Sequence, residues 1–573
     1  MKKQNLALAI SAALVLSACG GGSNKSEANA APNNIALSKS SVDENMKGAT
    51  IGTLSATDAN SGDTFTFSVE GDMFVVDGNT LKLAASKSAN YEAAKELKAK
   101  VTVKDKAGAS YSKELTISVN DLLDTYTFKS KLNVQGSSVS YSGQTARHVL
   151  INELNHYIDK TLDKDIKESN LANKAEVLAK LNSYFNLGSN DKAEKQVKWD
   201  NFPINSIQGA KQTHLENISG SYKDLAGKIA GNDPAGQHED WNKGAFVGWG
   251  AKGSTTPEGL IDILFGQLAD NAVAGERIRA DGEKIDLIYV TEDGVDLKQL
   301  IQKFLLMAIP YSQATDDYLG HETAGKGLTT DNKTNYKGDA KKTYTALEHQ
   351  FDEGFGYFGA ARDYLEYTDS EIAKKGGRTD WQGQHDTNND GKIDLKSEFN
   401  FGQSVNAAKR DRSTKDNAKP TDFTKTTMEA FIAGRKIIND NVGKNLNEFS
   451  EADRTALLKH RDNAVSGWEK AIAATVVHYI NDTIKDLDKL GTDNFEFNKL
   501  AKHWSEMKGF ALGLQFNPYS KINDEQFAMI HEKMGMKPVL TVAEKDDYEA
   551  KLLEARDIIQ AALKFDADNV KKW

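Results

Sequence analysis

The spacing of apolar residues changes once along the chain, near residue 124. Between residues 35 and 121 apolar and polar side chains alternate in short runs, as in Leu97–Val103 and Leu115–Val119. Such alternation places every second side chain on the same face of a β-strand. Turn signals rich in glycine, asparagine and aspartate, such as residues 77–79, separate the runs. Short strands at this spacing predict a β-sandwich.

After residue 124 apolar residues recur every three to four positions, which predicts amphipathic α-helices. The chain has only 8 prolines among 573 residues, which suits long uninterrupted helices. The segments with the clearest helical period are 145–162, 174–185, 257–272, 295–319, 344–367, 424–441, 452–490 and 548–565. We therefore expect a multidomain protein, with a β-sandwich over residues 35–121 and a large, mainly α-helical domain over residues 125–573.

The first residues have the pattern of an export signal. Two lysines precede an apolar run, residues 6–16, that is too short to span a bilayer as a permanent helix. The run ends in Leu-Ser-Ala-Cys (residues 16–19), which resembles the lipobox of bacterial lipoproteins. The resemblance implies a signal peptide over residues 1–18 and a lipid attached to Cys19. An ordinary secretory signal cut near Ala18 is the alternative.

Cys19 is the only cysteine, which excludes a disulfide within one chain. Acyl chains on Cys19 would bind the protein firmly to a membrane. Gly20 stands where an aspartate usually retains lipoproteins in the inner membrane. The resemblance therefore favours an outer-membrane lipoprotein of the cell envelope, facing the periplasm or the cell surface. Residues 19–34 are small and polar without an apolar period, and we expect them to form a flexible tether.

The overall charge narrows the range of partners. With a net charge of -10 and a mean hydropathy of -0.56, the chain lacks the basic footprint that nucleic acids require. The negative net charge is suited to a protein that binds cations. Besides the membrane, which it would reach through the lipid, we expect a partner protein of the cell envelope.

Five polar motifs in the predicted sandwich occur in the order of a cadherin repeat. They are Asp43-Glu44-Asn45, Asp58-Ala59-Asn60, Asn90-Tyr91-Glu92, Val103-Lys104-Asp105 and Asn120-Asp121. The region resembles a cadherin repeat, and cadherins bind calcium between successive repeats. The resemblance implies that Glu44, Glu92 and Asp121 form one half of a calcium site, and that Asp58 and Asn60 belong to the other half. With a single repeat no junction is complete, and a calcium-free spacer of the same fold is the alternative.

A second pattern of oxygen-bearing side chains begins at residue 386. Residues 386–398 read DTNNDGKIDLKSE, which resembles the EF-hand calcium loop. The expected ligands are Asp386, Asn388, Asp390, the carbonyl of Lys392, Asp394 and Glu398. Gly391 permits the sharp bend, and Ile393 anchors the loop to the core. The final acid falls one residue late, at Glu398, so we expect a lower affinity. An Asx-rich turn without metal is the alternative.

Two helical segments each place a histidine beside a carboxylate. His349 shares a helix face with Asp352 and Glu353, and His503 shares one with Glu506. A helix bundle that brought the two motifs together would offer nitrogen and oxygen ligands for iron, zinc or manganese. The alternative is a pair of buried histidine–carboxylate hydrogen bonds that fix helix packing.

Several segments of the helical region carry a further resemblance. They are residues 125–128, 142–147, 349–359, 406–411 and 503–518. Together they resemble a family of uncharacterised bacterial lipoproteins that is distantly similar to imelysin-like proteins. Imelysin-like proteins are helical and are associated with iron uptake, and some were named metallopeptidases. The resemblance implies that His349 with Asp352 or Glu353 corresponds to their histidine–acid motif.

Three classes of function follow from these patterns. The favoured one is a membrane-anchored, calcium-binding lipoprotein that takes part in the acquisition of iron or another metal. A cadherin-like adhesin and a metallopeptidase are the alternatives. The sequence has no helix with two histidines flanking a glutamate, no nucleophile elbow, no glycine-rich phosphate loop and no catalytic cysteine. No catalytic residues are therefore predicted.

Overall fold

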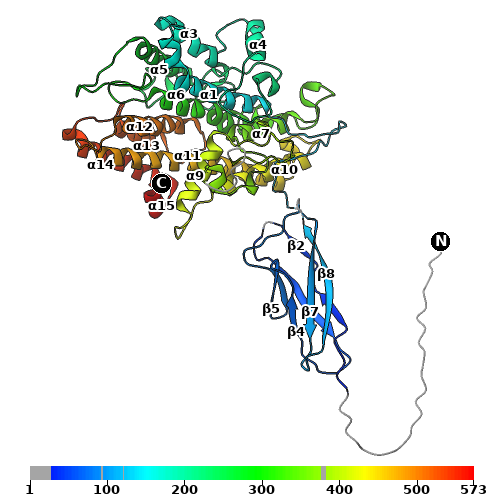
Figure 1. Cartoon of the computed structure of the whole chain (residues 1–573). Helices are drawn as coiled ribbons and strands as arrows, with labels where there is room; N and C mark the ends of the chain where they lie inside the picture. Colours follow the sequence, from blue (N-terminus) through cyan, green and yellow to red (C-terminus); the bar gives the residue numbers. More distant parts are fainter. Residues whose placement is uncertain (1–27, 45, 92–93, 121, 376–382) are drawn as a thin grey trace, which may run out of the picture. The chain divides into compact units, whose positions relative to one another are not determined.

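The computed structural model describes residues 28–44, 46–91, 94–120, 122–375 and 383–573. The chain divides between Leu122 and Leu123 into a β unit and a helical unit (Figure 1). The fold class predicted from the sequence, strands followed by a large helical region, is confirmed. The predicted signal peptide, Cys19 and the first part of the tether lie outside the described residues, and so do Glu92 and Asp121.

The β unit consists of two four-stranded sheets, with the strand orders β1-β3-β6-β5 and β2-β8-β7-β4. The strands are β1 (Asn34–Leu37), β2 (Ser41–Asp43), β3 (Thr50–Thr57), β4 (Thr66–Val69), β5 (Phe74–Asp77), β6 (Thr80–Leu83), β7 (Glu96–Lys104) and β8 (Ser110–Asn120). Strands β2 and β8 pair in parallel, with Ser41 opposite Ser118, and the other paired strands are antiparallel.

The alternation in the sequence decides which side of each sheet is buried. The inward-facing residues of β7 and β8 are Ala99, Val101, Val103, Leu115, Ile117 and Val119. They belong to one hydrophobic core shared by both sheets. Because successive side chains of a strand point to opposite faces, one apolar face per sheet is enough to form this core.

The helical unit has its own, larger core. Its α-helices are α1 (Ser142–Lys160), α2 (Leu162–Lys167), α3 (Lys174–Phe185), α4 (Lys192–Asp200), α5 (Pro257–Val273), α6 (Leu297–Leu306), α7 (Ala346–Phe358), α8 (Asp369–Ile372), α9 (Gly402–Thr414), α10 (Phe423–Asp440), α11 (Glu451–Leu487), α12 (Phe497–Leu512), α13 (Asp524–Met534), α14 (Val542–Leu563) and α15 (Ala567–Lys572). The longest helix, α11, packs against α9, α10, α12 and α14. In the part of the chain that the structure describes, no helix is both long and apolar enough to cross a membrane.

The segment predicted as one helix over residues 295–319 is less regular. It consists of α6 followed by two π-helical turns, η4 (Met307–Tyr311) and η5 (Gln313–Tyr318). Pro310 lies inside η4 and has no backbone N–H for an α-helical hydrogen bond. The apolar period thus continues through the segment, while the hydrogen-bond pattern changes at the proline.

The segment predicted as one helix over residues 344–367 ends early. Helix α7 ends at Phe358, and Gly359 follows with a φ of 82°. A left-handed residue at this position ends an α-helix, and glycine adopts it without strain. Helices α9 and α13 were not among the helices predicted from the apolar period.

Candidate calcium sites

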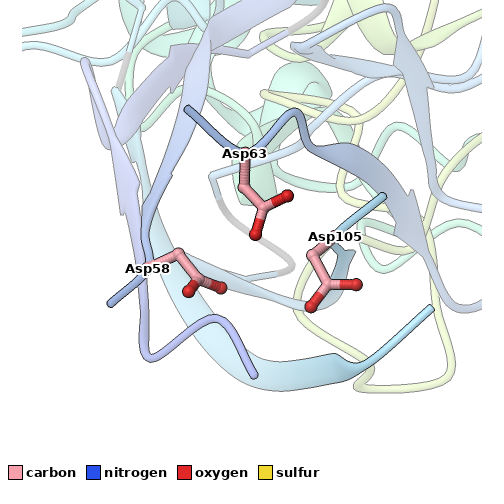
Figure 2. A group of neighbouring side chains, drawn as sticks. All are labelled: Asp58, Asp63 and Asp105. Atoms are coloured by element: carbon pink, nitrogen blue, oxygen red, sulfur yellow. The ribbon is translucent and has the colours of Figure 1, made fainter. Parts of the chain in front are cut away.

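Three aspartates gather at one end of the β-sandwich. Asp58 directly follows β3, Asp63 lies in the next loop, and Asp105 directly follows β7. Because β3 and β7 belong to different sheets, the group bridges the two sheets. Each aspartate offers a carboxylate oxygen, and these oxygens lie within 4.8 Å of one another. Figure 2 shows the three carboxylates around a shared space. No other group of three or more His, Cys, Asp or Glu residues meets this distance among the described residues.

Two of the three carboxylates have an oxygen without a partner among the described residues. Asp105 is 6 % exposed, and one oxygen each of Asp58 and Asp63, Oδ2 in both cases, is buried without a hydrogen-bond partner among the described residues. Buried polar atoms are normally paired, and negative charges at this spacing repel one another. A cation bound between the carboxylates would remove both costs. Ca²⁺ prefers such oxygen ligands.

Hydrogen bonds that involve Asn29, Ala30 and Asn60 fix the positions of Asp58 and Asp105. Asn29 Nδ2 donates to Asp105 Oδ2 at 2.9 Å, and this bond is the main cause that holds the pKa of Asp105 below its ordinary value. Asn60 N donates to Asp58 Oδ1 at 2.8 Å, while Asn60 Oδ1 accepts from Ala30 N at 2.7 Å. Asp105 is therefore held ionised. The side-chain oxygen of Asn60, which the sequence predicted as part of a calcium site, already accepts a hydrogen bond from a backbone N–H.

The sequence patterns selected Asp58 and Asn60 on this side of the sandwich, but missed Asp63 and Asp105 as ligands. Asp105 directly follows the long alternating run that forms β7. This position at the end of a strand could have marked Asp105 as a candidate ligand. Asp63 lies in a polar turn where aspartate is common for other reasons. Pairing across two sheets cannot be deduced from the local pattern.

The other predicted half of the site contains one described residue, Glu44. Its side chain is fully buried. Oε2 accepts from Tyr91 N at 2.6 Å, and Oε1 accepts from Leu122 N at 2.7 Å. Both carboxylate oxygens of Glu44 therefore accept hydrogen bonds from backbone amides, and these bonds link two segments of the β unit. Its predicted partners, Glu92 and Asp121, lie outside the described residues.

The loop at residues 386–398 has the bend that the sequence predicted. Gly391 has a φ of 80° and donates its backbone N–H to Asp386 Oδ2 at 2.9 Å. Asp390 N donates to both Asn388 Oδ1 and Asp386 Oδ1, at 2.9 and 3.2 Å. The oxygens of the first two expected ligands are therefore drawn to the inner side of the bend.

The last two expected side-chain ligands are engaged within the protein. Glu398 is 1 % exposed, and it accepts from Thr387 N at 3.0 Å and from Asp394 N at 2.8 Å. Asp394 Oδ1 accepts from Gln212 Nε2 at 2.8 Å. No three carboxylates of this loop have oxygens within 4.8 Å of one another in the structure as described. Glu398 thus closes the loop by bonding its backbone.

A neighbouring segment packs along the loop. Ile393 is 3 % exposed and forms a parallel bridge with Ala210, as an anchoring residue should. Lys211 Nζ lies 2.7 Å from Asp390 Oδ2, and its hydrogen bond is the main cause that lowers the pKa of Asp390. Lys392 N also donates to Asp390, at 3.0 Å. The lysine ammonium therefore supplies part of the positive charge that a metal ion would supply.

The first histidine motif lies in α7. His349 Nδ1 lies 2.8 Å from the carbonyl oxygen of Ser140 and therefore donates to it. His349 Nε2 lies 3.8 Å from Glu353 Oε1. The rings of Tyr336 and Tyr344 pack against the imidazole, with centroids 4.7 and 5.0 Å away. The imidazole is fixed by this packing.

Asp352, on the same helix, is neutralised by an arginine. Its side chain is fully buried, and Oδ1 accepts from Arg435 Nε at 2.8 Å and from the Tyr126 hydroxyl at 2.9 Å. Oδ2 accepts from Ser140 N at 2.9 Å. Burial raises the pKa of Asp352, while Arg435 acts in the opposite direction.

The second histidine motif has partners of its own. His503 Nδ1 lies 2.7 Å from Asp486 Oδ2, and Glu506 Oε1 lies 3.3 Å from Lys303 Nζ. No three of the five predicted transition-metal ligands bring their ligand atoms within 4.8 Å of one another in the described structure. Those five are His349, Asp352, Glu353, His503 and Glu506. The five side chains therefore do not gather into one group of ligands among the described residues, and Arg435 and Lys303 pair with Asp352 and Glu506.

Comparison with known proteins assigns most of the helical unit. Residues 124–540 match the model of a family described as a domain of unknown function (DUF4856). The match covers more than half of the chain and leaves the β unit outside it. No curated protein matches the sequence.

Proposed function

Since this chain belongs to the DUF4856 family, whose function is unknown, we propose a function from its own residues. We propose that the protein is a lipid-anchored, calcium-binding protein of the bacterial cell envelope. The observation that carries this proposal is the convergence of Asp58, Asp63 and Asp105, two of which have a buried oxygen without a partner.

The chemistry of this group favours calcium over other common ions. Ca²⁺ takes six to eight oxygen ligands and accepts carboxylates in mono- or bidentate form, so three aspartates can supply about half of its shell or more. Neither histidine nor cysteine belongs to the group, which disfavours zinc and copper. Extracellular modules bind calcium with dissociation constants of about 0.1–1 mM. An affinity in this range would suit an envelope protein.

The loop at residues 386–398 is the second calcium site of the proposal. Its bend and its inward-facing Asp386 and Asn388 support it. For calcium to bind, Lys211 must leave Asp390, and Glu398 must exchange its backbone bonds for the metal. Both changes cost free energy, so the loop binds more weakly than the group in the β unit.

The location of the protein rests on its N-terminal segment. The lipobox resemblance at Cys19 supports a membrane anchor, and the order of motifs in the sandwich supports a cadherin-like module. Three aspartates grouped beside the strand ends of a two-sheet unit agree with such a module. Iron and zinc have no part in the proposal, because Arg435 and Lys303 already pair with Asp352 and Glu506.

Calorimetric titration of the purified chain with calcium tests the first site. We expect binding by the wild type, and loss of the tighter of two binding events in Asp63→Asn, which keeps the shape of the side chain and removes its charge. Asp72→Asn is the matched control. Asp72 lies in the same unit, its side chain is 85 % exposed, and it pairs with Lys87. An equal effect of both substitutions, or no calcium binding by the wild type, would contradict the proposal.

The loop is tested by its own variant in the same titration. Asp390→Asn should remove the weaker binding event and leave the tighter one, whereas Asp416→Asn, at an exposed position outside the loop, should change neither. A wild type that binds calcium only in the β unit would show that Lys211 and Glu398 hold the loop closed as an Asx-rich turn.

A further inference from the structure

The helical unit contains a cavity of about 380 Å³ that belongs to neither of the candidate calcium sites. Residues from α1, α6, α9, α11 and α12 line it. Two polar atoms of the lining, Ser206 Oγ and Glu506 Oε2, are buried and have no hydrogen-bond partner among the described residues. Because buried polar atoms are normally paired, these two atoms indicate that the cavity takes a polar ligand.

The ammonium groups of the lining are already engaged or exposed. Lys303 Nζ donates to the side-chain oxygens of two glutamines, each at 2.6 Å, and lies 3.3 Å from Glu506 Oε1. All three of its protons are thus used within the protein. Lys374 and Lys409 also line the cavity, but both are exposed, so water can solvate their charges. The ligand therefore does not need a negative charge.

The amide side chains of the lining offer both donors and acceptors. Gln302 Oε1 accepts from Lys303, which leaves the Nε2 protons of Gln302 as donors. Asn406 Nδ2 donates to Gln403 Oε1 at 3.0 Å, which leaves Asn406 Oδ1 as an acceptor. A ligand with hydroxyl groups suits such a mixed set, because a hydroxyl can donate one hydrogen bond and accept others.

Aromatic rings form much of the apolar part of the lining. Phe399 and Phe401 have ring centroids 4.6 Å apart, and Tyr479 stacks on Phe510 with centroids 6.1 Å apart. Burial, followed by the negative charge of Glu506, raises the pKa of Tyr479, so its hydroxyl stays protonated. The cavity therefore offers apolar ring surface for C–H groups beside polar partners for hydroxyls.

We propose that this cavity binds a small neutral carbohydrate, a mono- or disaccharide. A sugar hydroxyl would donate to Glu506 Oε2, another would bond to Ser206 Oγ, and the C–H groups would contact the aromatic rings. The volume lies near the lower end of the range for small-molecule sites, about 300–1,000 Å³, which suits a ligand of this size rather than a long chain.

Other classes of ligand fit the lining less well. An anion would meet the unpaired carboxylate oxygen of Glu506, and a cation would meet the ammonium of Lys303 beside the same carboxylate. An apolar ligand would leave Ser206 Oγ and Glu506 Oε2 buried without partners, which costs free energy. A neutral ligand rich in hydroxyls avoids all three costs.

Calorimetric titration of the full chain tests this proposal, in a buffer with a chelator so that calcium does not contribute. The probes are glucose, galactose, mannose and N-acetylglucosamine, together with the disaccharides maltose, lactose and chitobiose. Glucose 6-phosphate and glucosamine are the charged counterparts. We expect one molecule of at least one neutral sugar to bind, more tightly than either charged sugar. Failure of every neutral probe to bind, or tighter binding of a charged one, would overturn the proposal.

A serine variant shows whether the sugar binds in this cavity. Ser206→Ala removes a hydroxyl that has no partner among the described residues, so it should leave the fold intact and weaken sugar binding about threefold to tenfold. Ser413→Ala is the matched control, because Ser413 also belongs to a helix that lines the cavity, α9, but its Oγ donates to the carbonyl oxygen of Arg410 at 2.8 Å. Unchanged affinity in Ser206→Ala, or equal weakening in both variants, would overturn the site.

A second variant tests the carboxylate. Glu506→Gln should weaken sugar binding about tenfold or more, because hydrogen bonds to a charged acceptor are stronger than those to an amide. Since Glu506 also pairs with Lys303, the melting temperature without sugar is the check on folding. Saturating sugar should raise the melting temperature of the wild type, and raise it less in Glu506→Gln. Undiminished affinity in folded Glu506→Gln would overturn the proposal.

Discussion

At the scale of single residues, Arg435 shows how ion pairs stabilise a buried charge. It is fully buried, and its guanidinium pairs with Glu348 at 2.9 Å and with Asp352 at 2.8 Å. Arg435→Met leaves two carboxylates buried without a counter-charge, and we expect a loss of about 3–5 kcal/mol in the free energy of unfolding. Lys436→Met is the control, because Lys436 forms only an exposed ion pair with Asp440. Denaturant unfolding of both variants checks this, and equal stability would contradict it.

A second residue, Asp369, should make stability depend on pH. Burial, followed by the negative charge of Asp411, raises the pKa of Asp369 to about 7. An acid whose pKa is raised on folding is destabilising when ionised, so the cost develops as the pH rises from about 4 to about 7. Asp369→Asn should therefore stabilise the protein by about 1–2 kcal/mol near pH 8 and not near pH 4. Melting curves at both pH values check this, with the exposed Asp416→Asn as the control. A gain that does not depend on pH would contradict it.

At the scale of elements, Gly359 decides where α7 ends. Its φ is 82°, and an added Cβ would lie 2.9 Å from Cβ of Phe401. Gly359→Ala should therefore destabilise the helical unit by about 1–3 kcal/mol. Gly266, inside α5 with open space around its Cα, is the opposite case, and Gly266→Ala should stabilise by about 0.5–1 kcal/mol. Thermal unfolding of the two variants should therefore shift in opposite directions, and shifts of the same sign would contradict this account.

At the scale of the whole molecule, the predicted anchor is a single residue. The strong membrane attachment that we propose would come from acyl chains on Cys19. Cys19→Ser should release the protein into the soluble fraction, whereas Ser23→Ala, in the same tether, should leave it in the membrane fraction. Membrane fractionation with a high-salt wash measures this. A Cys19→Ser protein that stays in the membrane fraction would contradict the lipoprotein proposal.

The sequence by itself determined the features that depend on local geometry. A period of two residues gave the strands of the β unit, and a period between three and four gave most of the long helices, because each period matches the repeat of one backbone conformation. The bend at Gly391 followed from the conformational freedom of glycine, and the burial of Ile393 from its place in the loop. These properties need only residues that are close together in the chain.

Only the tertiary structure determined which charged side chains come into contact. Asp58 and Asp105 are 47 positions apart and come together only because β3 and β7 end at the same side of a two-sheet sandwich. Asp352 looked like a metal ligand beside His349, yet Arg435, which is 83 positions away, neutralises it. Likewise, only the packing of α6 against α12 brings Lys303 to Glu506. Electrostatic interactions depend on distance in space and on burial, and neither can be deduced from spacing along the chain.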